Sequence, residues 1–291
     1  MRNFTEETIT AAVLASFALS TSPRAKEVSD ALVRHLHAFV REIRPTEAEW
    51  EWTIGFLTET GKMCSDTRQE FILLSDALGV SMLVDAINHP LPDGATETTV
   101  LGPFYVANPP EFELGANISP GQKGEAMFVE GTVRGPDGNP IKGAWIDTWH
   151  ADGGGYYDVQ TDATGKKLDM RARLHTDADG RYWYRSIVPA CYPIPNDGPV
   201  GKMLEAQGRH PYRPAHVHFM IGAPGYETLV THVFIAGDKY LDSDVVFGVK
   251  DSLIRALEAV PSGRTPAGHE VRDPVKLLHY DFVLGPAQVV I

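Results

Sequence analysis

The first ninety residues carry apolar side chains at three- and four-residue steps, which is the period of an amphipathic helix. One such stripe is formed by Val28, Leu32, Leu36, Phe39, Val40 and Ile43. Pro45 ends this helix, and Thr46 with Glu49 has the spacing of a capping box that begins the next one. The pattern therefore predicts two successive helices with an exposed polar face and a continuous apolar face.

A third helix is predicted over residues 67 to 88, from Thr67 to Asn88, with Phe71, Leu74 and Leu78 facing inward and Pro90 shortly after its end. These helices alone do not close a large core. We expect them to pack on the rest of the chain, on a second subunit, or on both.

From about residue 100 the apolar period changes to two, which is typical of strands with one buried face. Alternating segments occupy residues 126–133, 141–149, 181–188, 214–221, 229–236 and 279–285. The segment GPDGNP between the first two predicts a turn that joins them as a hairpin. Because no βαβ alternation is present, we predict a mainly β chain: an antiparallel β-sandwich catalytic domain over residues 101–291, after an α-helical dimerisation and linker domain over residues 1–100.

Composition narrows the possible partners and location. The net charge of −12 argues against nucleic acid and against an anionic membrane surface. No apolar run approaches the roughly 20 residues of a membrane span, so we do not expect a membrane protein. The cysteines, Cys64 and Cys191, form no disulfide framework, which suits a cytoplasmic protein.

The segment RPAHVHFMIG, residues 213–222, places two histidines one residue apart in a predicted strand. His216 and His218 would share one face, and Val217 would point to the opposite, buried face. Two imidazoles on one face can hold a metal, but they can also be ordinary packed histidines. A metal site would need further ligands from elsewhere in the chain.

Tyrosines are one source of those ligands, although most of the ten tyrosines are expected to be core or surface aromatics. Tyr157 follows three glycines that let the backbone approach a site closely, and Tyr192 lies in a proline-rich loop after a strand. Two phenolates and two imidazoles would favour a ferric ion over a ferrous one. Carboxylates are plentiful but have no ligand-like spacing with the histidine pair.

Four motifs taken together resemble the intradiol ring-cleaving dioxygenases. They are LGPFYV at 101–106, DTWHADGGGYYD at 147–158, CYPIP at 191–195 and RPAHVHF at 213–219. The resemblance implies one non-haem Fe(III) per subunit, with Tyr157, Tyr192, His216 and His218 as metal ligands. In the family the first ligand is the tyrosine just before the aspartate, which selects Tyr157 over Tyr156.

Within the family the chain is most similar to the hydroxyquinol 1,2-dioxygenases, in residues 72–89, 95–106 and 240–253. Catechol-specific members usually carry glutamine at the position of His232, which counts against a plain catechol enzyme. The implied reaction is cleavage of hydroxyquinol (benzene-1,2,4-triol) by O2 to 3-hydroxy-cis,cis-muconate, a tautomer of maleylacetate. The enzymatic alternative is a catechol or chlorocatechol 1,2-dioxygenase with the same ligands.

The resemblance also implies residue roles. The expected substrate pocket consists of Leu73, Asp76, Val100, Leu101, Gly102, Pro103, Ile194, Pro195, Arg213 and Val246. Asp76 would accept a hydrogen bond from the additional hydroxyl. The expected catalytic residues are Tyr192, which leaves the metal and takes a substrate proton, and Arg213, which places positive charge near the reacting ring.

The helical region resembles the dimerisation segment of the family, so we expect a homodimer joined through these helices. Some family members hold a lipid there.

Two alternative functions from other classes of protein remain open at this point. One is an Fe(II) oxygenase with two histidines and a carboxylate. The other is a transthyretin-like binding module in which His216 and His218 are packed in a core without metal.

Overall fold

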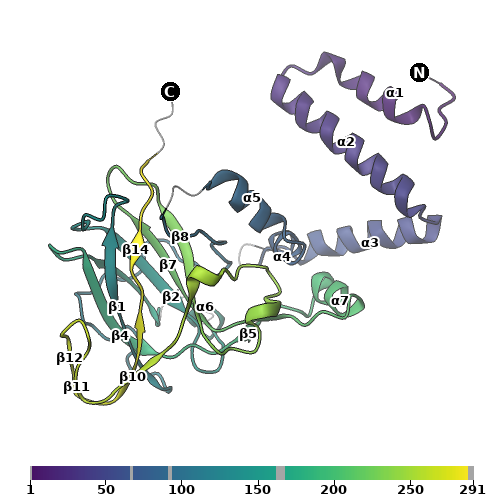
Figure 1. Cartoon of the computed structure of the whole chain (residues 1–291). Coiled ribbons are helices and arrows are strands. Elements are labelled where there is room, and N and C mark those ends of the chain that lie inside the picture. The colour runs from purple at the N-terminus through teal and green to yellow at the C-terminus, as the bar shows by residue number, and fades with distance from the viewer. Residues whose placement is uncertain (1, 66–67, 91–93, 162–167, 288–291) are drawn as a thin grey trace. The chain divides into compact units, whose positions relative to one another are not determined.

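The computed structural model describes residues 2–65, 68–90, 94–161 and 168–287 (Figure 1). Two compact units make up the chain, residues 1–59 and residues 60–291, and each is described by itself. The first unit is entirely helical where it is described, apart from its connecting loops, and the second contains all the described strands.

The N-terminal unit contains three helical segments and most of a fourth. They are α1 (Ile9–Ser16), the 3-10 turn η1 (Phe17–Leu19), α2 (Pro23–Ile43) and α3 (Glu47–Met63). The predicted capping box is confirmed: the Thr46 amide donates to Glu49 Oε2 at 2.7 Å, and the Glu49 amide donates to Thr46 Oγ1 at 3.3 Å. The left-handed Arg44 (φ 50°) ends α2 just before Pro45.

The apolar stripe of α2 is formed as predicted but remains open to solvent in the single chain. None of the described residues of α2 is buried, and Leu32 is 62% exposed. On α3 the large side chains Trp50 and Trp52 are 59% and 68% exposed. Exposed apolar surface of this kind usually marks an interaction site.

The predicted third helix is two helices, so the prediction of one continuous helix is wrong. They are α4 (Glu70–Ala77) and α5 (Val80–Asn88), separated by Gly79 in the left-handed region at φ 73°. The predicted inward face is also wrong, because Phe71 and Leu78 are exposed whereas Leu73 and Asp76 are buried. The predicted start at Thr67 lies outside the described residues.

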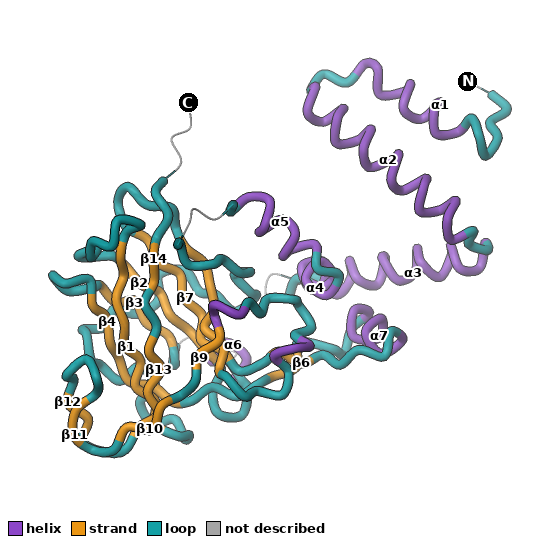
Figure 2. Tube along the Cα trace, viewed as in Figure 1, coloured by secondary structure: helices purple, strands orange, loops and turns teal. Residues whose placement is uncertain are grey.

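The second unit is built on two five-stranded sheets (Figure 2). The first contains β1 (Ala126–Arg134), β4 (Arg181–Ile187), β10 (Glu258–Val260), β13 (Val275–His279) and β14 (Phe282–Val283). The second has the order β3 (Arg171–His175), β2 (Trp145–His150), β7 (His216–Gly222), β8 (Leu229–Ile235) and β9 (Ile254–Arg255).

Two short ladders lie outside the large sheets, namely β5 (Tyr192–Pro193) with β6 (Tyr212–Arg213) and β11 (Gly263–Arg264) with β12 (Glu270–Val271). The remaining elements of the unit are α6 (Asp158–Thr161), α7 (Pro199–Ala206), η2 (Leu241–Ser243) and η3 (Asp251–Leu253). These elements lie in the loops that follow the strands, where binding residues commonly concentrate.

The main core lies between the two sheets, which confirms the sandwich. It joins Val129 and Tyr184 of one sheet to Ile146, Val217 and Phe219 of the other, and all five side chains are fully buried. The sheets are mixed rather than purely antiparallel, since β1 pairs in parallel with β13 and β14, and β8 with β9. Among the described helices, none is long and apolar enough to cross a bilayer.

The predicted hairpin around GPDGNP is only partly formed. The Gly135 amide donates to the Asn139 carbonyl at 2.9 Å, so the turn is present. However, β1 and β2 then enter different sheets, because β1 pairs with β4 whereas β2 pairs with β3 and β7. The segment after the turn thus crosses the sandwich instead of extending the hairpin.

A charge cluster at the end of β13 makes the stability of the second unit dependent on pH. His279 Nε2 lies 3.5 Å from Asp281 Oδ2, and its Nδ1 lies 3.8 Å from Glu130 Oε1. The bond to Asp281 and the neighbouring Glu130 raise the pKa of His279 to about 10. Asp281, bonded to His279 and to Thr132, has its pKa lowered to about 2. His279 has the larger shift because it faces two carboxylates.

We predict that His279→Gln destabilises the protein below neutral pH but not at high pH. The stability from protonated His279 is fully present below its ordinary pKa of 6.5 and is lost as pH rises towards about 10. Thermal unfolding should therefore give a lower Tm for the variant at pH 6 and matching values near pH 10. His35→Gln, at an exposed position of α2, is the control. A constant difference at all pH values would contradict the ion-pair origin.

Candidate metal centre

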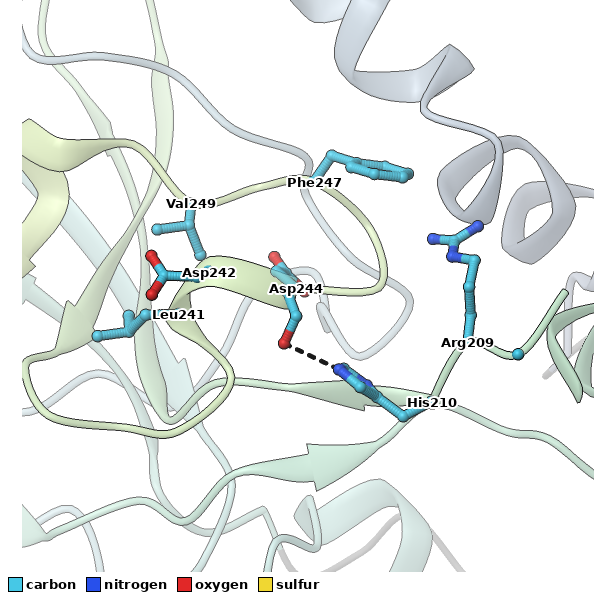
Figure 3. Close-up of a pocket in the computed structure, with 9 residues that line it drawn as sticks. Arg209, His210, Leu241, Asp242, Asp244, Phe247 and Val249 are labelled. Carbon is cyan, nitrogen blue, oxygen red and sulfur yellow. Dashed lines mark hydrogen bonds between the residues drawn. The ribbon is translucent and has the colours of Figure 1, made fainter.

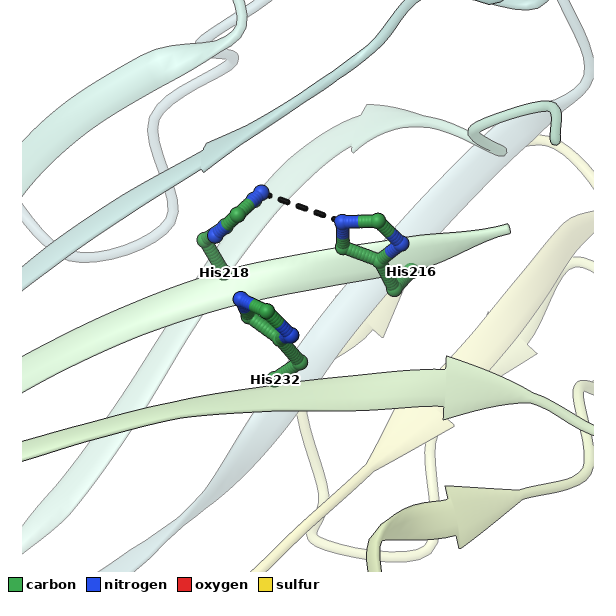
Figure 4. Close-up of side chains that lie close together, drawn as sticks. All are labelled: His216, His218 and His232. Carbon is green, nitrogen blue, oxygen red and sulfur yellow. Dashed lines mark hydrogen bonds between the residues drawn. The ribbon is translucent and has the colours of Figure 1, made fainter. Parts of the chain in front are cut away.

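The alternation of β7 fixes which side chains face the centre. Val217 and Phe219 enter the sandwich core, so His216 and His218 lie together on the outer face of the sheet. The neighbouring strand places His232 opposite His218 in the antiparallel ladder. Figure 4 shows the three imidazoles gathered over β7 and β8, and each is at least 98% buried.

The four side chains predicted as ligands are brought together at this face. Tyr157 Oη lies 2.9 Å from His218 Nε2, 3.5 Å from His216 Nε2 and 3.4 Å from Tyr192 Oη. The two Nε2 atoms of the histidines are 3.0 Å apart. Two oxygens and two nitrogens thus converge on one point from three separate segments of the chain.

His216 presents a lone pair rather than a proton to this point. His216 Nδ1 donates to the Pro214 carbonyl at 2.7 Å, so the neutral ring carries its proton there and leaves Nε2 free to coordinate. Burial, together with neighbouring positive charge, lowers the pKa of His216 and His218 well below 6.5. Both rings are therefore neutral at physiological pH.

This donor set fits a metal ion. Bonds of roughly 2.0–2.2 Å place adjacent ligand atoms about 3 Å apart, which is the spacing of the Nε2 and Oη atoms here. Burial, with Tyr192 beside it, raises the pKa of the Tyr157 phenol well above 10, so Tyr157 would ionise only against a positive charge. A cation bound between the four groups would supply that charge. It would also relieve the repulsion between the lone pairs of the ligand atoms, which point towards one another.

Tyr157 is held by a buried ion pair and an aromatic ring. The adjacent Asp158 pairs with Arg171 through both carboxylate oxygens, and Arg171 Nη1 also donates to the Phe104 carbonyl at 3.1 Å. The Phe104 ring stacks on Tyr157 with a centroid separation of 4.4 Å. One guanidinium thus positions both the phenol and the ring that covers it.

Tyr192 is positioned by the β5–β6 ladder, in which it pairs directly with Arg213. Gly155, at φ 86°, packs against this segment so closely that a Cβ there would lie 2.9 Å from the Cys191 carbonyl oxygen and 3.0 Å from Tyr192 Cβ. This is the close backbone approach that the three glycines of the sequence predicted.

Arg213 is a buried cation at the edge of the centre. Its Nε lies 3.2 Å from Asp244 Oδ1 and its Nη2 lies 3.3 Å from Asp244 Oδ2. Its Nη1 lies 3.4 Å from His216 Nε2. Burial acts against the charge, but Asp244 outweighs it and keeps the pKa of Arg213 above its ordinary value. The guanidinium is therefore permanently charged beside the donors.

His232 was not among the predicted ligands, yet its ligand atom lies within 4.8 Å of those of His216 and His218. Its Nδ1 faces Arg213 Nη2 at 3.4 Å, and since arginine only donates, that nitrogen carries the lone pair. Among the described residues, Tyr157 Oη contacts His216 and His218 but not His232, so His232 fits a partner of Arg213 better than a ligand. The described groups gathered here include no carboxylate, which disfavours the two-histidine, one-carboxylate site.

A narrow cavity adjoins Tyr192 and Arg213. It is lined by Leu73, Asp76, Val100, Gly102, Pro103, Phe104, Tyr192, Ile194, Pro195, Arg213 and Val246. Nine of the ten residues expected in the substrate pocket are in this lining, whereas Leu101 lines a wider neighbouring hollow of about 410 Å³. Phe104 was not anticipated, because nothing in its local sequence shows that it folds over Tyr157.

Comparison with known protein families agrees with this arrangement. A family model described as "Dioxygenase" matches residues 100–286, and one described as "Catechol dioxygenase N terminus" matches residues 22–96. The chain belongs to the intradiol dioxygenase family. Two curated members are each 52% identical to it: a 6-chlorohydroxyquinol 1,2-dioxygenase from Cupriavidus pinatubonensis, over 98% of this chain and 99% of the relative, and a hydroxyquinol 1,2-dioxygenase from Nocardioides simplex, over 97% and 96%.

Solved structures of the intradiol dioxygenases show the same fold. The crystal structure of a hydroxyquinol 1,2-dioxygenase from Pseudomonas putida DLL-E4 matches with a TM-score of 0.92 and 47% identity. The match covers 97% of this chain and 99% of the other. The packed-histidine binding module without enzymatic activity is therefore not the class to which this dioxygenase belongs.

We predict that Arg171→Met strongly destabilises the dioxygenase, because it leaves the buried carboxylate of Asp158 unpaired. Loss of one partner from a buried pair costs about 3–5 kcal/mol. Urea unfolding at fixed protein concentration measures this free energy. Arg24→Met removes an exposed pair with Glu27 and should change it by less than about 1 kcal/mol. Equal effects of the two substitutions would contradict the positioning role of the buried pair.

Proposed function

We propose that this dioxygenase cleaves hydroxyquinol between its adjacent hydroxyl-bearing carbons with O2, at a non-haem Fe(III), to give 3-hydroxy-cis,cis-muconate. The observation that carries the proposal is the convergence of Tyr157, Tyr192, His216 and His218 beside a cavity that contains Arg213. Two phenolic oxygens are hard anionic donors, which suit a ferric ion better than zinc or ferrous iron. We propose one iron per subunit.

The four donors would hold the iron through Tyr157 Oη, Tyr192 Oη, His216 Nε2 and His218 Nε2. When bound, ferric iron would act as a Lewis acid that stabilises the deprotonated diol and draws electron density from its ring. Trp149, stacked on His218 at 4.6 Å, keeps that imidazole in a fixed plane. The buried walls exclude water from the donors.

Tyr192 and Arg213 carry the catalytic roles in this proposal. Tyr192 lines the cavity and is one of the donors, so its Oη is placed to take a proton from a substrate hydroxyl as the diol binds. Arg213 lies across the β5–β6 ladder from it and presents fixed positive charge to the negative charge that develops on the ring. Asp244 holds the guanidinium in one orientation.

We propose that Asp76 recognises the third hydroxyl of hydroxyquinol by accepting a hydrogen bond from it. It projects from α4 into the cavity and is 94% buried, so few other partners are available to it. Burial raises the pKa of Asp76, and its hydrogen bond with Ser81 opposes that shift. A buried acceptor left without its partner is costly, so a diol lacking this hydroxyl should bind less well.

Two observations support hydroxyquinol over catechol or chlorocatechol. The curated relatives at 52% identity are named for hydroxyquinol and 6-chlorohydroxyquinol. In addition, the motif resemblance places His232 where catechol-specific members usually carry glutamine. Catechol and chlorocatechol cleavage with the same ligands is the second candidate function.

The N-terminal helices are the proposed site of homodimerisation. The exposed apolar stripe of α2, with Leu32 62% exposed, needs a cover, and a second copy of the same helix offers a complementary surface. A lipid between the paired helices is a compatible occupant. In this scheme residues 1–100 serve as the dimerisation and linker domain and residues 101–291 as the catalytic domain, in a cytoplasmic enzyme.

We predict a red to purple colour for the iron-loaded protein, from tyrosinate-to-iron charge transfer, and a kcat/KM for hydroxyquinol above that for catechol or 4-chlorocatechol. Tyr157→Phe should abolish or shift the absorption band and reduce turnover by at least about 100-fold. The measurements are visible absorption, iron content and oxygen uptake on each diol.

Tyr156→Phe is the matched control, because Tyr156 is adjacent in sequence but 57% exposed. It should leave the band and the rates unchanged. A colourless protein with full iron occupancy would contradict the tyrosinate site, and a dominant rate on catechol would contradict the hydroxyquinol assignment.

For the assembly, we predict a dimer mass by light scattering, and a shift towards monomer when Leu32 and Leu36 are both replaced by Glu. Two charges on the apolar stripe oppose its burial against a second copy. Replacing Arg24 and Glu27, which lie on the exposed polar side of α2, by Ser should leave the mass unchanged. A monomeric wild-type protein would exclude the dimer.

A further inference from the structure

The Arg209 guanidinium lies outside both the donor set and the lining of the substrate cavity. It follows α7 and, together with Phe247, lines a separate hollow (Figure 3). Its Nη1 donates to the Ala77 carbonyl at 2.6 Å, and its Nη2 donates to the Val245 carbonyl at 2.9 Å. One planar group therefore joins two segments that are far apart in the sequence.

Each of these two segments contributes residues to the lining of the substrate cavity. Ala77 is the last residue of α4, where backbone carbonyls lack helical partners and favour a cation. The same helix supplies Leu73 and Asp76 to the cavity, and the residue after Val245 supplies Val246. Arg209 thus connects the wall that carries Asp76 with the wall that carries Val246.

The second wall is a tight turn that needs support. The Asp244 carboxylate accepts hydrogen bonds from the Val246 amide at 3.4 Å and the Gly248 amide at 3.0 Å. Between them, Phe247 adopts φ 59°, a conformation that is costly for a residue with a bulky side chain. Its ring lies under the guanidinium, with Arg209 Cζ 4.9 Å from the ring centroid.

We propose that Arg209 is a positioning residue that sets the separation between α4 and the turn of residues 244–248, and so selects diols that carry the hydroxyl read by Asp76. The inference rests on the proposed function. The planar guanidinium matters because it reaches two carbonyls and one ring at once, which an ammonium group does not.

Selectivity is the property on which Arg209 acts most, although the turn that it bonds also carries Asp244, the partner of Arg213. The four metal donors and Arg213 are carried by the β-sandwich and its loops, and Arg209 contacts none of them in the described structure. A displaced α4 moves Asp76 away from the third hydroxyl of hydroxyquinol. Catechol has no such hydroxyl, so its binding depends less on this wall.

The test compares Arg209→Met and Arg209→Lys with the wild-type iron-loaded enzyme on hydroxyquinol and catechol. For Arg209→Met we expect the ratio of kcat/KM for hydroxyquinol to that for catechol to fall about tenfold, the equivalent of one lost hydrogen bond. The change should lie mainly in KM, with the charge-transfer band unchanged. Arg209→Lys should restore part of the ratio and guards against a failure of the Met variant to fold.

Arg255→Met is the matched control. Arg255 Nη1 also donates to a backbone carbonyl, that of Ile254 at 2.7 Å, and its Cζ lies 4.6 Å from the Tyr280 ring centroid, but it lines no part of the cavity. Its substitution should leave the selectivity ratio unchanged.

A binding measurement complements the kinetics. Anaerobic titration of the absorption band with hydroxyquinol gives a Kd that does not depend on turnover, and this Kd should rise about tenfold in Arg209→Met.

A double-substitution cycle separates positioning from general stability. In an Asp76→Asn background, Arg209→Met should cause little further loss of selectivity, because the two residues act through one contact. Equal losses on both diols, or a full additional loss in that background, would overturn the positioning role. A wild-type protein that cleaves neither diol would instead refute the proposed function itself, and the inference would fall with it.

Discussion

The centre depends on the packing of β7 against the opposite sheet. Val217 and Phe219 are fully buried in the sandwich core. Because alternate residues of a strand point to opposite faces, His216 and His218 must lie on the outer face of the sheet. A slip of one residue in the register would exchange the two sets, turning imidazoles into the core and apolar side chains towards the tyrosines. The metal donors therefore take their precision from apolar packing on the other side of the same strand.

Burial also sets the electrostatics of the centre. Desolvation keeps the imidazoles of His216 and His218 neutral and the phenol of Tyr157 protonated, so the donors hold little negative charge of their own. The nearby cation, Arg213, is paired with Asp244, and its Nη1 also lies 3.4 Å from His216 Nε2. A cation that enters the centre therefore provides the charge against which a phenolate becomes stable.

Local sequence predicted the parts of the fold whose cause is local. The capping box of Thr46 and Glu49, the shared face of His216 and His218, and the close approach of Gly155 all follow from short spacings. Other features depend on register between distant strands. His232 lies opposite His218 only because of the register in which β7 and β8 pair, and no short motif in the sequence predicts that register.

The errors at the third helix and at the hairpin have the same origin. The inward face of α4 was assigned from its apolar positions, yet Leu73 and Asp76 are buried because the cavity and the core beneath it lie on that side. Similarly, GPDGNP forms its turn, but the choice of partners for β1 and β2 is made by the whole sandwich. The motif resemblance went further than local patterns, since it linked segments that meet only in the folded chain.

The residues that bind the metal and the residues that recognise the ring substituents of the substrate lie on different elements of the fold. The metal donors and Arg213 project from the sandwich and its loops, whereas Asp76 and Leu73 project from a separate short helix, α4. Side chains on α4 can therefore change without moving a donor atom, provided that the helix keeps its distance from the turn opposite. A group such as Arg209, which holds that distance from outside the cavity, constrains selectivity as firmly as a residue in contact with the substrate, because a hydrogen bond to a ring hydroxyl weakens steeply with small displacements of its acceptor.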